Sequence, residues 1–254
     1  MRKQLITFDQ DWAPDWAVNL CIDLMESQRV PFTFFVTHRS PVLHRLRRAP
    51  GVELGIHPNF LDASTHGATP SEVLETVLDL VPEAKSMRTH SLMQSTPLLT
   101  AVCQSTSIRN DVSLLLPFSQ ELPITHFRFS GSRITRLPFS WEDDEAMARS
   151  EWDWDTRVWP GPRDGTYVYN FHPIHVALNS NSMSPYGVLK SRLGSRPLHA
   201  LEFAEAKEFI NPGRGARTYL EELLCDERSE WLLVDSFCSI PRPSTHRVGG
   251  LGEK

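Results

Sequence analysis

Short apolar runs alternate along this chain with segments in which apolar residues recur every three or four positions. The first strand-like run covers residues 4–8, and a helical pattern follows Pro14. Further strand-like runs lie at residues 32–36, 52–56, 108–116, 124–139, 167–171 and 231–234, and a short one begins at Met87. Helical spacing occurs at residues 41–48, 71–81, 97–104, 200–209 and 217–224. This alternation predicts an α/β fold with a mainly parallel sheet of roughly seven strands.

Four of the strand-like runs end on a residue that can bind a metal or transfer a proton. These residues are Asp9, His57, His90 and His172. When parallel strands close into a β/α barrel, their C-terminal ends meet at one face. The pattern therefore predicts that these four side chains and Asp11 share one pocket.

Length and charge restrict the class of protein. A chain of 254 residues fits one barrel, so we expect a single domain over residues 1–244 and a flexible tail over residues 245–254. The balance of 26 Lys plus Arg against 31 Asp plus Glu gives a net charge of −5, which disfavours a nucleic-acid partner. No segment approaches the roughly 20 apolar residues of a membrane span, so we expect a cytoplasmic protein.

The sharpest local motif is Asp9-Gln10-Asp11. Side chains alternate along a strand with a period of two, so an extended chain places the two carboxylates on the same face. Like charges held close together raise each other's pKa unless a cation or hydrogen bonds compensate. The pair therefore indicates a metal site, a shared proton or a catalytic base, and the alternative is a solvated loop after a strand.

Histidines supply candidate partners for Asp11. His57 precedes Pro58 and lies where its strand ends, and the second imidazole is either His90 or His66. We favour His90, because a strand end holds ligand geometry better than a loop does. Two imidazoles and a carboxylate suit zinc or iron.

Histidine is also the side chain best suited to donate a proton near neutral pH, because its unperturbed pKa is about 6.5. Of the pair His172 and His175, the first lies nearer the preceding strand and is the one we expect in the pocket. Arg88 is a candidate for bracing Asp9 through a charge-assisted pair.

Tryptophans flanked by acids form two clusters, one at Trp141 and one at Trp152 and Trp154. Indole rings beside carboxylates can stack on a sugar and hydrogen-bond its hydroxyls, which indicates a carbohydrate groove. The alternative is ordinary packing at the edge of a long loop.

These residues resemble a known family. The segment Leu5-Ile6-Thr7-Phe8-Asp9-Gln10-Asp11 is similar to the opening Thr-Phe-Asp-Asp of the NodB-homology polysaccharide deacetylases, which are carbohydrate esterase family 4. The segments 31–36, 53–60, 88–91 and 170–173 extend the resemblance to the divergent WbmS-type branch, which is associated with O-antigen sugar biosynthesis. The resemblance covers residues 4–176 and implies a distorted seven-stranded (β/α) barrel.

The resemblance implies a role for each matching residue. Asp9 matches the catalytic base, Asp11 the metal-binding aspartate and His57 the first histidine ligand. The family has a second histidine four residues after the first, and here that position is Leu61. His90 or His66 would have to replace it.

The later motifs match less closely. Arg88 resembles the arginine that orients the base, although Arg136 is a rival for that role. Asp111 corresponds to a later aspartate of the family, and His172 matches the acid histidine of the last motif.

The implied activity is metal-dependent hydrolysis of an N-acetyl or related acyl group on a sugar. The implied cofactor is one divalent ion, zinc first and otherwise iron, manganese or cobalt. The substrate would be an N-acylated sugar or a nucleotide- or lipid-linked saccharide. The alternatives are a haloacid-dehalogenase-like magnesium phosphatase, in which Asp143 and Asp144 form a later acidic motif, and an inactive carbohydrate-binding protein. The sequence does not indicate the oligomeric state.

Overall fold

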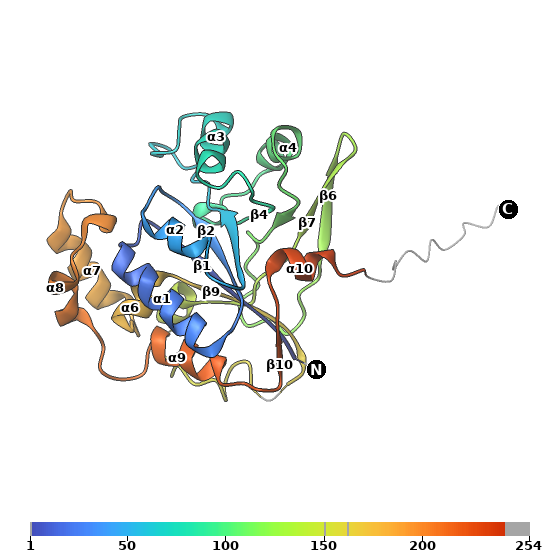
Figure 1. Cartoon of the computed structure of the whole chain (residues 1–254). Coiled ribbons are helices and arrows are strands. Elements are labelled where there is room, and N and C mark those ends of the chain that lie inside the picture. Colours follow the sequence, from blue (N-terminus) through green and yellow to red (C-terminus); the bar gives the residue numbers. More distant parts are fainter. Residues whose placement is uncertain (1, 150, 162, 242–254) are drawn as a thin grey trace.

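The computed structural model describes residues 2–149, 151–161 and 163–241. Within them ten strands form one sheet with the order β6-β7-β5-β4-β3-β2-β1-β9-β8, and β10 pairs with β1 (Figure 1). The strands are β1 (Arg2–Asp9), β2 (Phe32–Val36), β3 (Val52–Ile56), β4 (Ser86–Met87), β5 (Asn110–Asp111), β6 (Thr125–Phe129), β7 (Ser132–Arg136), β8 (Trp141–Glu142), β9 (Gly165–Phe171) and β10 (Ser229–Trp231). Among these strands only the β6–β7 pair is antiparallel, which confirms the predicted α/β class.

The sheet curls into a distorted barrel, because one continuous segment links strands far apart in the strand order. Within residues 132–142, β7 pairs with β5 and β8 pairs with β9. In the segment that joins β7 to β8, a parallel bridge links Phe139 to Leu115, and the N–H of Ser140 donates to the carbonyl of Val168. Ten strands replace the roughly seven expected, because β6 adds a hairpin, residues 132–142 count as two strands, and β10 lies beside β1.

Strand β1 has three neighbouring strands and determines where the site lies. It pairs in parallel with β2, β9 and β10, and its C-terminal half is in register with β2 while the whole strand runs beside β9. Asp9 is opposite Phe35, and Phe8 is opposite Phe171. The residues that follow β1, β2 and β9 therefore emerge at the same edge.

Helices cover the outside of the sheet. They are α1 (Asp15–Gln28), α2 (Val42–Leu46), α3 (Pro70–Leu80), α4 (Thr96–Ser105), α5 (Asp143–Met147), α6 (Pro173–Leu178), α7 (Met183–Leu193), α8 (Phe203–Ala206), α9 (Ala216–Leu224) and α10 (Val234–Ser239). In Figure 1 α1, α6 and α9 lie together on one side, and α7 and α8 lie outermost, beyond α6. Helix α3 begins at a capping box, in which Thr69 and Glu72 satisfy each other's backbone N–H groups.

Most predicted elements are confirmed, but several differ in extent or position. Of the predicted strand 108–116 only Asn110 and Asp111 pair as a strand. The last strand, β10, ends at Trp231, and α10 begins where the strand was expected to end. Helix α7 was not predicted, because Pro185 and Gly187 interrupt its weak apolar pattern.

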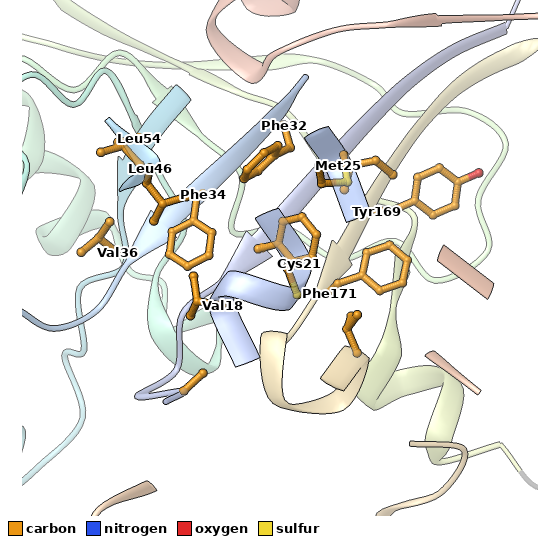
Figure 2. Packing of buried hydrophobic residues seen from close by; sticks show 14 of the residues in the cluster. Val18, Cys21, Met25, Phe32, Phe34, Val36, Leu46, Leu54, Tyr169 and Phe171 are labelled. Carbon is orange, nitrogen blue, oxygen red and sulfur yellow. The ribbon is translucent and has the colours of Figure 1, made fainter. Parts of the chain in front are cut away.

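The core between α1 and the sheet is aromatic and sulfur-rich. Figure 2 shows Val18, Cys21 and Met25 of α1 facing Phe34 of β2 and Phe171 of β9. All five are almost completely buried. Each of the valine, methionine and phenylalanine side chains contributes about 1.5–3 kcal/mol through removal of its apolar surface from water, so this layer fixes α1 on the strands that carry the site.

A smaller apolar cluster attaches the α7–α8 region to the barrel. Its buried members come from α6, α7 and the segment around α8: Ile174, Leu178, Leu189, Leu193, Leu201 and Ala206. Trp16 of α1 packs against this cluster. The region therefore docks on the two helices that follow β1 and β9.

Two further expectations from the sequence concern a membrane span and the C-terminal tail. Across the described residues, no helix combines the length and apolar character needed to cross a membrane. The tail expected over residues 245–254 lies outside the described residues.

Candidate active site

The residues predicted to share a pocket meet where the parallel strands end. Asp9 is the last residue of β1, and His57 comes directly after β3. Arg88 follows β4, and His90 starts the short 3-10 helix η1 (His90–Leu92). His172 follows β9. The sheet therefore brings together residues separated by up to about 160 positions, as expected at the C-terminal face of a barrel.

Asp11, His57 and His90 form a compact group of metal donors. The distance from Asp11 Oδ1 is 2.9 Å to His57 Nε2 and 3.0 Å to His90 Nδ1. The two imidazole nitrogens are 3.4 Å apart. One carboxylate and two imidazoles, converging from three strand ends, fit a divalent transition metal.

The charges around this group favour an ionised carboxylate. Burial opposes the charge on Asp11, but His57, His172 and His90 outweigh it, and together they hold the pKa of Asp11 well below its usual range. Burial likewise opposes protonation of His57, but Asp9 and Asp11 outweigh it and raise the pKa of His57. Asp11 is therefore in the form that a metal ligand requires.

Asp11 reaches this position through a turn and not through the strand. Strand β1 ends at Asp9, and both Asp11 (φ +40°) and Trp12 (φ +55°) have left-handed backbone conformations. The N–H of Asp11 donates to Thr37 Oγ1 at 3.0 Å, and Gln10 Oε1 accepts from the N–H groups of Thr37 and His38. The period-two geometry of an extended chain therefore ends at Asp9, and the loop after β2 holds the turn that carries Asp11.

His66 is not a member of the donor group. Its Nδ1 accepts a hydrogen bond from the N–H of Asn59 at 3.1 Å, and its ring lies 5.9 Å from that of Trp12. Leu61, at the position where the resemblance calls for a histidine, is 40 % exposed. The geometry therefore favours His90 over His66.

Asp9 is held by a buried polar network. Its Oδ1 is 3.0 Å from Arg88 Nη1, and its Oδ2 accepts from Asn170 Nδ2 at 2.8 Å. Arg88 is fully buried between the rings of Phe35 and Phe139, whose centroids lie 4.8 Å and 4.4 Å from its guanidinium carbon. This network keeps the Asp9 carboxylate oriented next to His57, whose Nδ1 is 3.6 Å from Asp9 Oδ1.

Arg136, the rival to Arg88, has a different partner. Its Nε donates to Asp111 Oδ2 at 2.8 Å, and its guanidinium also contacts Gln94. Asp111 is buried and bonded to the loop after β5. Neither residue of this ion pair is among the partners of Asp9 or His172.

His172 is oriented by Asp143, which sequence reasoning placed elsewhere. His172 Nδ1 is 2.6 Å from Asp143 Oδ1, and its backbone N–H donates to Asp143 Oδ2 at 2.8 Å. Burial opposes the imidazolium, but Asp143 and Asp144 outweigh it and raise the pKa of His172 well above its usual value. Its Nε2, 3.5 Å from Asp11 Oδ2, faces the donor group.

The acids of residues 142–144 were read as part of a sugar groove or a phosphatase motif, and they line this site instead. Glu142 Oε1 accepts from Asn170 Nδ2 at 2.9 Å, and burial raises the pKa of Glu142 to about 7. Asp144 lies 3.1 Å from His175 Nε2. The signal that could have located them is the position of Glu142 on a strand beside β9, with Asp143 and Asp144 at the start of the following helix, and this shows only through the pairing of β8 with β9.

The tryptophans predicted to bind sugar belong to the core. Trp141 is 0 % and Trp154 is 3 % exposed. Trp141 stacks on Tyr219 at 4.7 Å, and Trp152 packs edge-on against the same tyrosine at 5.8 Å. The sugar-groove prediction for Trp141 and Trp154 is therefore wrong, because their faces are covered by other rings. Trp152 is only partly buried, but it belongs to the same cluster.

Comparisons with known proteins show the family to which the chain belongs. The model of the family described as "WbmS-like: Polysaccharide deacetylase" matches residues 6–190. A crystal structure from Bordetella bronchiseptica, described as a polysaccharide deacetylase involved in O-antigen biosynthesis, is 34 % identical with a TM-score of 0.75. The two structures align over 87 % of this chain and 89 % of the Bordetella chain. The chain belongs to the WbmS-like polysaccharide deacetylase family.

The comparison with solved structures also found more distant matches. A family 4 carbohydrate esterase from Bacillus anthracis is 14 % identical over 92 % of this chain and 81 % of its own, with a TM-score of 0.46. A family 4 acetyl xylan esterase from Clostridium thermocellum, solved with cobalt, is 16 % identical over 68 % and 74 %, with a TM-score of 0.40. A search of curated protein sequences found no match.

Membership of the WbmS-like family identifies the chain as a hydrolase of the carbohydrate deacetylase class, which acts on amide bonds. The phosphatase alternative is therefore wrong. Its proposed acidic motif, Asp143 and Asp144, is bonded instead to His172 and His175.

Proposed function

We propose that this chain is a metal-dependent hydrolase that removes an N-acetyl group from a sugar of an O-antigen or related surface polysaccharide. The observation that carries the proposal is the placement of two pairs beside the donor group: Asp9 with Arg88, and His172 with Asp143. One pair offers a carboxylate and the other an imidazolium, which are the base and the acid that amide hydrolysis needs.

Asp11, His57 and His90 would hold the metal. A divalent ion there, zinc in this proposal, would supply Lewis acidity for the amide carbonyl and the attacking water. Iron, manganese and cobalt accept the same donors.

The side chains of the chain itself would move the protons. Asp9, paired with Arg88, would take a proton from the attacking water as a new C–O bond forms. His172, protonated beside Asp143, then gives a proton to the nitrogen as the C–N bond breaks. Water and the amide become acetate and a free amine on the sugar. Glu142 and Asn170 keep the two halves of the site in contact, since the Asn170 amide donates to both Glu142 and Asp9.

The proposed substrate is a saccharide that is still linked to a nucleotide or lipid, and the proposed location of the reaction is the cytoplasm. It would be the precursor on which an O-antigen deacetylase acts before the polymer is exported. The proposal includes no nucleic acid.

The test is acetate release together with metal content. Asp9→Asn and His172→Ala should retain the metal and lose about 10²-fold or more in turnover, the usual cost of losing one proton-transfer group. Asp23→Asn and His44→Ala, which change exposed residues of α1 and α2, are the matched controls. A metal-loaded wild-type protein that releases no acetate from N-acetylated nucleotide sugars, lipid-linked saccharides or oligosaccharides would leave the carbohydrate-binding alternative.

A further inference from the structure

A second group of metal donors lies beside the first. Asp144 belongs to α5, His172 precedes α6 and His175 belongs to α6. Each of the three residues offers one donor atom, and these atoms all lie within 4.8 Å of one another. Two imidazoles and one carboxylate repeat the composition of the donor group around Asp11, and zinc binds to such sets.

Both imidazoles of this second group are held so that the same ring nitrogen is available. His172 Nδ1 is 2.6 Å from Asp143 Oδ1, and His175 Nδ1 is 3.3 Å from Ser180 Oγ. An imidazole that binds a metal through one nitrogen usually gives the N–H of the other to a neighbouring acceptor, which fixes the ring. Both rings are buried and already have that neighbour at Nδ1, so their Nε2 atoms are left for a cation.

The third donor is in close contact with His175 without being hydrogen-bonded to it. Asp144 Oδ1 is 3.1 Å from His175 Nε2, yet this buried oxygen has no hydrogen-bond partner in the part of the chain that the structure describes. A buried carboxylate oxygen that accepts no hydrogen bond is costly, and a cation shared with His175 would remove that cost. The Asp144 side chain as a whole is 45 % exposed, so solvent ions can reach it.

Asp11 connects the two groups of donors. Its Oδ1 lies between His57 and His90, and its Oδ2 is 3.5 Å from His172 Nε2. A carboxylate can bind a different ion through each oxygen, as in the two-metal sites of other hydrolases. Asp143 and Asp144 add two carboxylates on the His172 side, and this charge favours a cation there.

We propose that Asp144, His172 and His175 form a second divalent-cation site, which shares Asp11 with the first, and that a cation bound there inhibits hydrolysis. The inhibition rests on the proposed function, whereas the binding site does not. His172 would give its Nε2 proton to the leaving nitrogen, and the cation uses the lone pair of the same atom. One nitrogen cannot hold both, so a filled second site removes the acid. The second ion also meets the charge of the first across Asp11 and therefore binds more weakly.

The binding test is isothermal titration calorimetry, with zinc as the probe and protein that already holds one equivalent of zinc. The wild-type protein should bind one further equivalent. His175→Ala and Asp144→Asn should keep the first equivalent, as measured by elemental analysis, and weaken the second by about 10-fold or more, since even loss of an outer contact costs a metal site that much. Asp23→Asn changes an exposed carboxylate of α1, and His66→Ala a buried imidazole outside both groups. Both controls should bind the second equivalent as the wild type does.

Acetate release during the same titration tests the inhibition. The wild-type rate should fall by about 10²-fold as the second site fills, the usual cost of losing one proton-transfer group. In Asp144→Asn the ratio of the rate at one equivalent of zinc to the rate in excess zinc should shrink by about 10-fold or more. This ratio does not depend on how fast the variant is at one equivalent.

A wild-type protein that binds no second equivalent, or a second equivalent that both Asp144→Asn and His175→Ala bind unchanged, would overturn the site. A rate that rises or stays constant as the second ion binds would overturn the inhibition. The two proposals fail in different ways. Second-site binding that the variants weaken, without acetate release at any zinc concentration, would refute the deacetylase alone, whereas acetate release by a protein that binds only one ion would refute the second site alone.

Discussion

The buried pair of Arg88 and Asp9 should couple strongly in stability. Arg88→Met keeps an unbranched side chain between the two phenylalanine rings but removes the charge. It would leave Asp9 buried at 2 % exposure without its cation. It would also remove the donor to the carbonyl of Val112 and to Thr7 Oγ1, at 3.0 Å and 2.9 Å. Breaking a buried ion pair from one side costs about 3–5 kcal/mol.

The assay is urea or thermal unfolding of a double-mutant cycle with Arg88→Met, Asp9→Asn and the double variant. The single arginine variant should melt about 6–20 °C lower, from about 2–4 °C per kcal/mol in a chain of this size. The double variant should lose at least about 2 kcal/mol less free energy of unfolding than the sum of the two single losses. The reason is that it leaves no uncompensated charge.

A surface pair provides the control. Arg192 and Glu208 are 57 % and 58 % exposed, and their coupling should stay within about 0–1 kcal/mol. Additivity of the Arg88 and Asp9 variants to within about 0.5 kcal/mol would refute the reasoning, since it would show that the buried network does not depend on the pair.

Three other predictions follow from the site. His90→Ala should lose the bound metal while His66→Ala retains it, as measured by elemental analysis; the reverse would move the third ligand to the loop. Asp143→Asn should lower turnover about 10-fold or more by weakening the charge-assisted bond that orients the acid imidazole, without loss of metal; unchanged turnover would contradict that role. Since burial raises the pKa of Glu142 from 4.5 to about 7, the folded state binds more protons there, so this group's contribution to stability declines as pH rises from 4.5 through 7. Glu142→Gln should remove that component of the pH dependence of unfolding, and an unchanged dependence would contradict it.

Sequence reasoning was most successful at the ends of long, regular strands. Strands β1, β2, β3 and β9 have clear apolar runs, so their C-terminal residues could be assigned to one edge from the sequence alone. Asp9, His57 and His172 were found in this way, and the structure brings them together with Asp11 and His90. The general rule that parallel strands end at one face was sufficient for that result.

The precise position of Asp11 depended on interactions that a local pattern does not contain. Asp11 belongs to a left-handed turn that is held by Thr37, a residue 26 positions away at the end of another strand. Periodicity describes a chain that remains extended, and this chain leaves the strand two residues earlier. The helix predicted over residues 200–209 is likewise divided in the structure into short helices, among them α8, and the local spacing did not show these breaks.

The misassignment of Trp141 and Glu142 shows why composition alone cannot locate a groove. The two residues are neighbours on β8, a strand of two residues, so their side chains point to opposite faces. Trp141 packs on Tyr219 of α9, outside the sheet, whereas Glu142 points to Asn170 inside the site. A sugar groove required ring and carboxylate on one face, and a paired strand forbids that. The pairing that decides it joins Trp141 to Tyr169, 28 residues later, and is therefore a tertiary fact that local sequence could not supply.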